Sequence, residues 1–99
     1  MPFSNRYDFD ILVNEAERLV LAELEKQLDE RADDSICLCE DCVLDMAAYA
    51  LNAVKPMYRV SLLGSLYAAH AMDEASYAQA VRSAVDQAIR KISENPSHD

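Results

Sequence analysis

Apolar residues recur every three or four positions over residues 9–32, which is the period of one face of an α-helix. The residues that carry this pattern are Phe9, Leu12, Val13, Ala16, Leu19, Val20, Leu24 and Leu28. Glutamates and basic residues lie between them, at spacings that suit ion pairs on an exposed face. The pattern predicts a long first helix over 9–32, capped at its start by Asp8 or Asp10.

A second helix is predicted over residues 43–54, because the same period continues there. Its apolar positions are Val43, Met46, Ala47, Ala50, Leu51 and Val54. Pro56 should stop the helix near Val54, since proline lacks a backbone donor and the residue before it avoids helical angles. Residues 57–60 are then expected to be extended.

Two more helices complete the pattern. Ser61 can cap a third helix over residues 62–72, and Asp73 can cap a fourth. The apolar face of the fourth helix consists of Tyr77, Val81, Val85, Ala88, Ile89 and Ile92. Asn95 followed by Pro96 is a typical stop signal at its end. The sequence thus predicts an all-α fold, a small bundle of about four helices, with residues 1–99 forming a single domain.

The composition agrees with helices and short connections, since 52% of the residues are hydrophobic and the chain has one glycine and three prolines. So short a chain buries only about two-thirds of the surface that it exposes when unfolded, and its core needs reinforcement. The apolar residues of the first helix, such as Leu12 and Leu21, are too widely spread to face one core. We therefore expect a homodimer in which this helix buries a second face.

The formal net charge of −9, from 18 acidic and 9 basic residues, repels phosphate polymers and anionic membrane surfaces. No stretch approaches the ~20 apolar residues that span a bilayer, and the N-terminus lacks a signal-peptide pattern. We expect a cytoplasmic protein that binds neither polymeric nucleic acid nor membranes. A small anionic ligand stays compatible with this charge, because it senses mainly the groups around it.

Cys37, Cys39 and Cys42 form a C-x-C-x-x-C run directly before the second helix. Thiolates hold zinc tetrahedrally at ~2.3 Å, and the positive end of the following helix should lower their pKa values. An odd number of cysteines without a signal peptide argues against a disulfide framework. These residues predict a structural metal site, with zinc as the metal.

The fourth donor of this site is open. The candidates are Asp41, Asp45, His70 and His98. Two other interpretations of the cysteines are three free thiols and a redox-active Cys39 and Cys42 pair. The strand that precedes such a pair in thioredoxin-like proteins is not predicted here.

Lys55, Tyr58 and Arg59 form a short concentration of positive and aromatic groups, and Arg6 and Tyr7 form a similar pair near the start. The simplest interpretation is a solvated turn with a tyrosine packed on the bundle. The alternative is a ligand site formed by these positive and aromatic groups.

The chain resembles the late competence protein ComFB family along nearly its whole length. The matching residues, in chain order, are Asn14, Glu17, Val20, Cys37, Cys39, Cys42, Asp45, Ala50, Leu51, Asn52, Pro56, Tyr58, Val60, Ser61, Gly64, Tyr67, Asn95, Pro96 and His98. Lys55 and Met57 depart from the family pattern beside Pro56, and Ser97 replaces the usual arginine of the terminal motif.

The resemblance implies a small helical dimer with a cysteine-bound zinc, and a receptor for cyclic dinucleotide second messengers, above all cyclic di-GMP. The residues suited to contact such a ligand are Arg59, Tyr58, Lys55, Arg6 and Tyr7. We expect a non-enzymatic receptor that signals to a downstream protein. The alternatives are a zinc-stabilised helical dimer that acts only as a protein-interaction adaptor, and a thiol enzyme, for which no base is placed near the cysteines.

Overall fold

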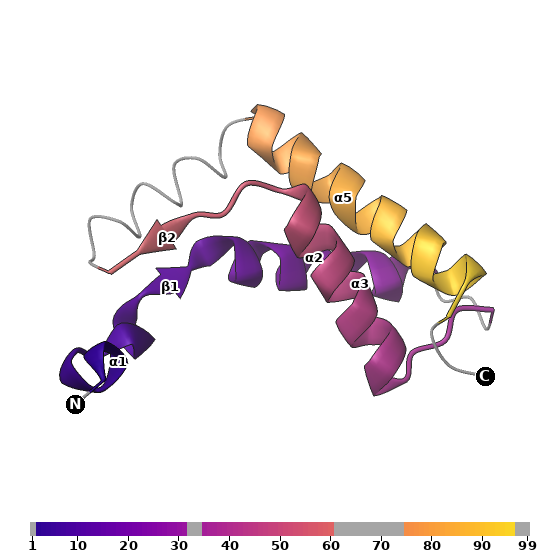
Figure 1. Ribbon diagram of the computed structural model, residues 1–99. Helices are drawn as coiled ribbons and strands as arrows, with labels where there is room; N and C mark the ends of the chain where they lie inside the picture. The colour runs from indigo at the N-terminus through magenta and orange to yellow at the C-terminus, as the bar shows by residue number, and fades with distance from the viewer. Residues whose placement is uncertain (1, 32–34, 61–74, 97–99) are drawn as a thin grey trace.

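The computed structural model describes residues 2–31, 35–60 and 75–96, and three long helices dominate this part of the chain (Figure 1). They are α2 (Glu15–Arg31), α3 (Glu40–Ala53) and α5 (Ala75–Glu94). Two short helical segments precede them, α1 (Phe3–Arg6) and the 3₁₀ turn η1 (Phe9–Ile11). Strands β1 (Val13–Asn14) and β2 (Tyr58–Arg59) form a small antiparallel pair.

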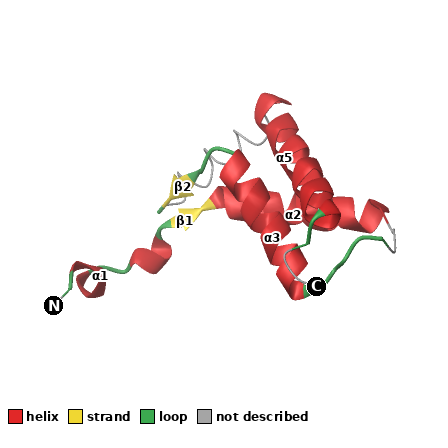
Figure 2. Cartoon of the chain, turned by 45° about the vertical axis from the view of Figure 1, so that its right-hand side comes forward, coloured by secondary structure: helices red, strands yellow, loops and turns green. Residues whose placement is uncertain are grey.

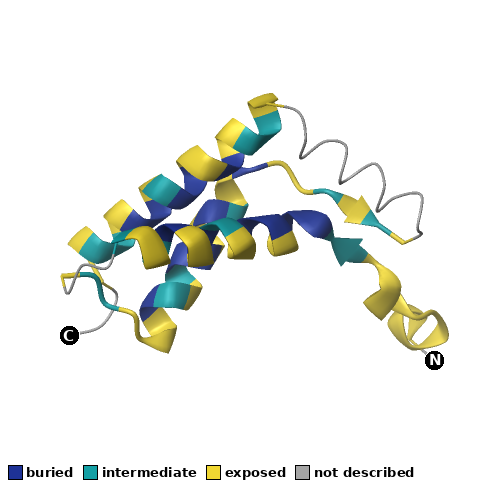
Figure 3. Ribbon diagram, turned by 180° about the vertical axis from the view of Figure 1, so that it is seen from behind, coloured by how far each residue is buried: buried dark blue, intermediate teal, exposed yellow. Residues whose placement is uncertain are grey.

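The core lies where α2, α3 and α5 pack against one another (Figure 3). Met46 and Ala50 on α3 are fully buried, as are Val20 on α2 and Val81 on α5. The alanine lets the helices approach closely, while the larger side chains fill the space between them. Helix α3 therefore lies in the core, with the three cysteines at its start and strand β2 after its end.

The predicted second and fourth helices are confirmed. Helix α3 ends at Ala53, and Val54 is already extended (φ −117°, ψ 157°), two residues before Pro56. The predicted face of α5 is buried or packs against the core. The predicted third helix, with Tyr67 and His70, lies outside the described residues, as does His98.

The first predicted helix was wrong at its start, because α2 begins at Glu15 and not near Phe9. Val13 and Asn14 are extended and pair with Arg59 and Tyr58. Asn14 Oδ1 accepts the backbone N–H of Ala16 (3.1 Å), which is an N-cap contact. The strand pairing and this cap bond give the backbone hydrogen-bond partners outside a helix, so α2 begins only at Glu15. The predicted cap Asp8 instead caps η1, where its carboxylate accepts the Asp10 N–H (3.1 Å).

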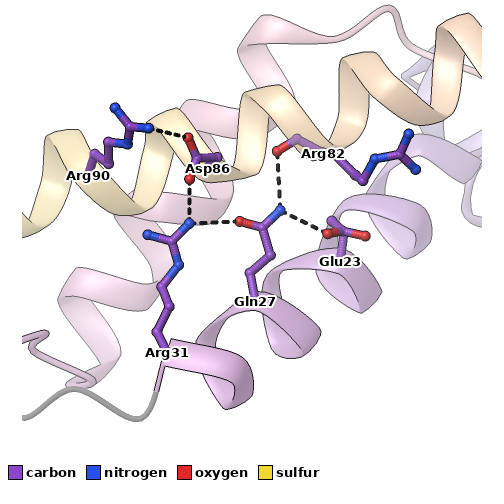
Figure 4. Close-up of polar contacts among 6 residues, drawn as sticks. All are labelled: Glu23, Gln27, Arg31, Arg82, Asp86 and Arg90. Atoms are coloured by element: carbon purple, nitrogen blue, oxygen red, sulfur yellow. Dashed lines mark hydrogen bonds and ion pairs between the residues drawn. The ribbon is translucent and has the colours of Figure 1, made fainter.

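A polar clasp joins α2 to α5 (Figure 4). The half-exposed Arg31 forms an ion pair with Asp86, and Arg31 Nη2 donates to Gln27 Oε1 (3.1 Å). Gln27 Nε2 donates to the Arg82 carbonyl (3.1 Å) and to Glu23 (2.8 Å). Gln27 is only 9% exposed, so these bonds satisfy a buried amide and fix the two helices in register.

Among the described residues, no helix combines the length and the apolar character needed to cross a bilayer.

Candidate functional site

The three cysteines lie in a turn that leads into α3, and we call residues 37–42 the cysteine turn. Cys39 is the N-cap of α3, and its Sγ accepts the Cys42 N–H at 3.4 Å. This cap turns the chain back on itself, so that the ligand atoms of Cys37, Cys39 and Cys42 all lie within 4.8 Å of one another. A tetrahedral zinc with Zn–S bonds of ~2.3 Å needs sulfurs about 3.8 Å apart, so a small contraction suffices. The three side chains could hold a metal ion.

The thiols differ in their tendency to ionise. The Cys39 backbone N–H, followed by the Cys39 and Cys42 thiols, donates to Cys37 and lowers its pKa. Burial, reinforced by the neighbouring sulfurs, raises the pKa of Cys42 to about 12. We expected the positive end of the helix to lower the pKa values of these thiols. The pKa of Cys37 is lowered by hydrogen bonds, and the expectation was wrong for Cys42, where loss of water dominates. A bound dication would offset the repulsion between neighbouring thiolates, because cysteines bind metals in their ionised form.

Among the described residues, the group of converging metal-ligating atoms consists of these three sulfurs. Asp45, a predicted fourth donor, is half-buried one turn after Cys42 and already takes part in an interaction. Asp41 is exposed. The structure thus brings together the three predicted cysteine ligands.

At the other end of α3, the chain returns to the start of α2 (Figure 2). The β1–β2 pair places Val13 opposite Arg59 and Asn14 opposite Tyr58. Asn14 Oδ1 accepts the Met57 N–H (2.7 Å), and the Met57 carbonyl accepts the Glu15 N–H (2.7 Å). These bonds fix residues 57–59 against the first turn of α2.

Glu15 is the centre of a charged group that we call the Glu15 cluster, together with Arg18 and Arg59. Glu15 is 5% exposed. Its Oε1 accepts from Arg59 Nε at 2.6 Å, and its Oε2 accepts from Arg18 Nε at 2.9 Å. The hydrogen bonds from Arg18 and Arg59 hold the pKa of Glu15 below its usual value, although burial opposes them. A single carboxylate therefore anchors two guanidinium groups, and the cluster carries one net positive charge.

The predicted ligand contacts are divided between two places. Tyr58 is 64% exposed beside the anchored Arg59. Lys55 is exposed just before them, and its carbonyl accepts the Tyr77 hydroxyl (3.0 Å). Arg6 and Tyr7 instead lie at α1, where the guanidinium sits 5.7 Å from the ring centroid. Figures 1 and 3 both show α1 beyond the outer end of β1 and away from the helices.

Glu15 and Arg18 were not predicted as members of this site. Their spacing of three residues was visible as a pair on a helix surface. Nothing in the sequence showed that Arg59, 44 positions from Glu15, completes the group.

Fold and site together define a class: a small helical protein whose central helix starts at a three-cysteine turn, and whose short strand pair fixes an arginine to a buried glutamate. The chain belongs to the ComFB family, because the family model for late competence development protein ComFB matches residues 13–96. A similar solved structure is that of the late competence protein ComFB from Bacillus subtilis. It is 26% identical, with a TM-score of 0.71 over 87% of this chain and 92% of that chain. A comparison with curated proteins gives no match. The family predicted from the sequence is confirmed.

Proposed function

We propose that this protein is a non-enzymatic receptor for a cyclic dinucleotide, foremost cyclic di-GMP, and works as a homodimer with a structural zinc in the cysteine turn. The observation that carries the proposal is the Glu15 cluster beside Tyr58. A buried carboxylate holds Arg59 in place, next to a tyrosine ring that is 64% exposed. An anchored guanidinium loses less conformational freedom on binding than a solvated one, which favours an anionic ligand. The exposed ring beside it favours a planar ligand that can stack on it.

The chemistry of these groups suits a guanine nucleotide. Arg59 donates to Glu15 through Nε, and a guanidinium has five donors in all, so its Nη groups suit the O6 and N7 acceptors of guanine. Tyr58 supplies a surface for base stacking. Lys55 and Arg18 supply positive charge for the phosphates, and Arg18 is 64% exposed although it is tied to Glu15.

The dimer and the metal are further parts of the proposal. A cyclic dinucleotide with two equivalent halves suits the two-fold axis of an isologous dimer, where two copies of Arg59 meet one ligand. The three converging sulfurs support zinc, which prefers thiolate donors in closed structural sites. The metal then serves the fold, since it fixes the start of the helix whose far end leads to Tyr58 and Arg59.

A calorimetric titration of the full chain with cyclic di-GMP and, separately, cyclic di-AMP tests the proposal. We expect binding of cyclic di-GMP, weakened roughly tenfold or more by Tyr58→Ala, because stacking on an aromatic ring contributes about 1–3 kcal/mol per base. The matched control is Tyr49→Ala, which removes another partly exposed tyrosine, from α3, and should leave the affinity unchanged. No heat with either nucleotide at high micromolar concentration would remove the proposal and leave the adaptor alternative.

A further inference from the structure

Cys39 and Cys42 form a C-x-x-C pair at the start of α3, and the two thiols differ in their access to solvent. Cys39 is the N-cap of the helix and is exposed, as are all of residues 38–41 (Figure 3). Cys42 lies in the first turn of the helix and is only 1% exposed. In reactive C-x-x-C pairs, a reagent from solvent reaches one thiol, and the second thiol then closes a disulfide with it. The pair at the start of α3 has this division between an accessible and a covered sulfur.

The backbone already holds these two sulfurs close together. The Cys42 N–H donates to Cys39 Sγ at 3.4 Å, and the Cys39 carbonyl accepts the Val43 N–H at 3.0 Å. Both sulfurs belong to the group whose ligand atoms all lie within 4.8 Å of one another. A disulfide needs its sulfurs about 2 Å apart, so a shift within one turn of the chain closes the bond.

Cys37 is the third sulfur of the cysteine turn and is a poorer member of such a pair. It is half-buried, so a reagent from solvent reaches it less easily than Cys39. A single residue separates it from Cys39, and a disulfide between them would close a smaller ring than the C-x-x-C pair does. The exposure and the spacing therefore favour Cys39 and Cys42 as the oxidised pair.

We propose that the cysteine turn is a reversible peroxide-sensitive switch, in which Cys39 and Cys42 form a disulfide and the metal is released. Both residues enter as thiolates, the form in which cysteines hold a metal. Cys39 Sγ attacks one oxygen of hydrogen peroxide, so that an S–O bond forms, the O–O bond breaks and hydroxide leaves. Cys42 Sγ then attacks Cys39 Sγ, so that the S–S bond forms, the S–O bond breaks and a second hydroxide leaves. The two hydroxides take up two protons and become water, and the two electrons lost by the sulfurs reduce the peroxide.

Oxidation should release the metal because it removes most of its ligands. A disulfide sulfur is no longer a thiolate, so two of the three converging sulfurs stop binding. Cys37 alone then remains, whereas structural zinc sites need four ligands. In the part of the chain that the structure describes, the group of converging metal-ligating atoms has no member besides these sulfurs.

The reduced state of the three cysteines fits a switch at rest. Disulfides in reducing compartments are transient and belong to catalytic or redox-sensing sites. The inference rests on the metal of the proposed function, and it requires neither the nucleotide nor the dimer.

The test treats the zinc-loaded full chain with hydrogen peroxide in slight molar excess, in the presence of a zinc-responsive dye. We expect the bound zinc to be released and two of the three thiols to become resistant to alkylation. Cys37 should remain the alkylated residue, and cleavage after Glu40 should leave two fragments joined until a reductant is added. Dithiothreitol should restore all three thiols and the ability to bind zinc.

Two single variants separate the pair from the third cysteine. Cys37→Ser keeps the pair, so both remaining thiols should be lost to peroxide together. Cys42→Ser removes the second thiol, so Cys39 should stop at the sulfenic acid, which dimedone traps as a stable adduct. These readouts are thiol and adduct counts, so they hold whether or not a variant still binds zinc. Circular dichroism checks the helices, and Cys37→Ser should keep them because that residue is half-buried.

Each contrary result has a distinct meaning. Zinc and all three thiols that survive prolonged exposure to millimolar peroxide would overturn the switch. A disulfide that includes Cys37, or one that joins two chains, would overturn the assigned pair. Oxidation that dithiothreitol does not reverse would show damage in place of a switch. If the reduced chain holds no zinc, the metal of the proposed function and its release fail together, and the thiol counts still decide whether Cys39 and Cys42 form a disulfide.

Discussion

The cysteine turn and the Glu15 cluster lie at the two ends of α3 and are built in opposite ways. The cysteine turn takes its three sulfurs from six consecutive residues, and a local N-cap bond folds them together. The Glu15 cluster takes its partners from positions 44 residues apart, and a strand pair brings them into contact. The first is a local structure that a metal can complete. The second depends on the whole fold and needs no metal.

Metal removal should distinguish the two sites most strongly, because the metal belongs to the cysteine turn and not to the Glu15 cluster. A chelator at neutral pH should lower the melting temperature by roughly 5–10 °C or more, because metal that binds only the folded chain stabilises it. Cys42→Ser should have the same effect without a chelator, since it removes the buried thiol of the three. Differential scanning calorimetry alongside metal analysis provides the measurement. An unchanged melting temperature after complete metal loss would contradict a structural role for the metal.

Asn14 is the polar residue that connects the Glu15 cluster to the rest of the fold. Asn14→Ala loses the cap bond to Ala16 and the bond to the Met57 N–H, so we expect a loss of about 1–2 kcal/mol in the free energy of unfolding. The matched control is Asn52→Ala at an exposed position of α3, which should change stability by less than about 0.5 kcal/mol. Urea unfolding measures both. Equal effects of the two substitutions would mean that Asn14 does not hold the strand pair to α2.

Acid should affect the Glu15 cluster by a smaller amount. The pKa of Glu15 is lowered in the folded protein, so its ionised form contributes stability above its usual pKa of 4.5. That contribution is lost as the pH falls below 4.5 and through the lowered value. Melting temperatures measured from pH 7 to pH 3 should therefore fall less steeply for Glu15→Gln than for the unmodified protein. Parallel curves would show that the two arginines do not favour the ionised carboxylate.

The contrast between the sites also explains what could be predicted from the sequence. The cysteine turn, the stop at Pro56 and the buried face of α5 depend on neighbours within a few residues, and each was predicted correctly. The start of α2 was not, because Val13 fits a helical pattern equally well until its pairing with Arg59 is known. The raised pKa of Cys42 was missed for a related reason, since burial is its largest cause and the sequence pattern does not show how deeply one thiol is buried. Features that depend on contact between segments far apart in the sequence could not be predicted from a local pattern.

The two sites meet in one proposal: a metal-stabilised dimer whose anchored Arg59 and exposed Tyr58 receive a cyclic dinucleotide. Native mass spectrometry of the full chain, with and without cyclic di-GMP, tests this claim most directly because it reports subunits, metal and ligand together. We expect a dimer that carries zinc on each chain and gains the mass of the nucleotide without losing metal. A monomer, a metal-free dimer, or a dimer that gains no mass at high micromolar nucleotide would contradict it.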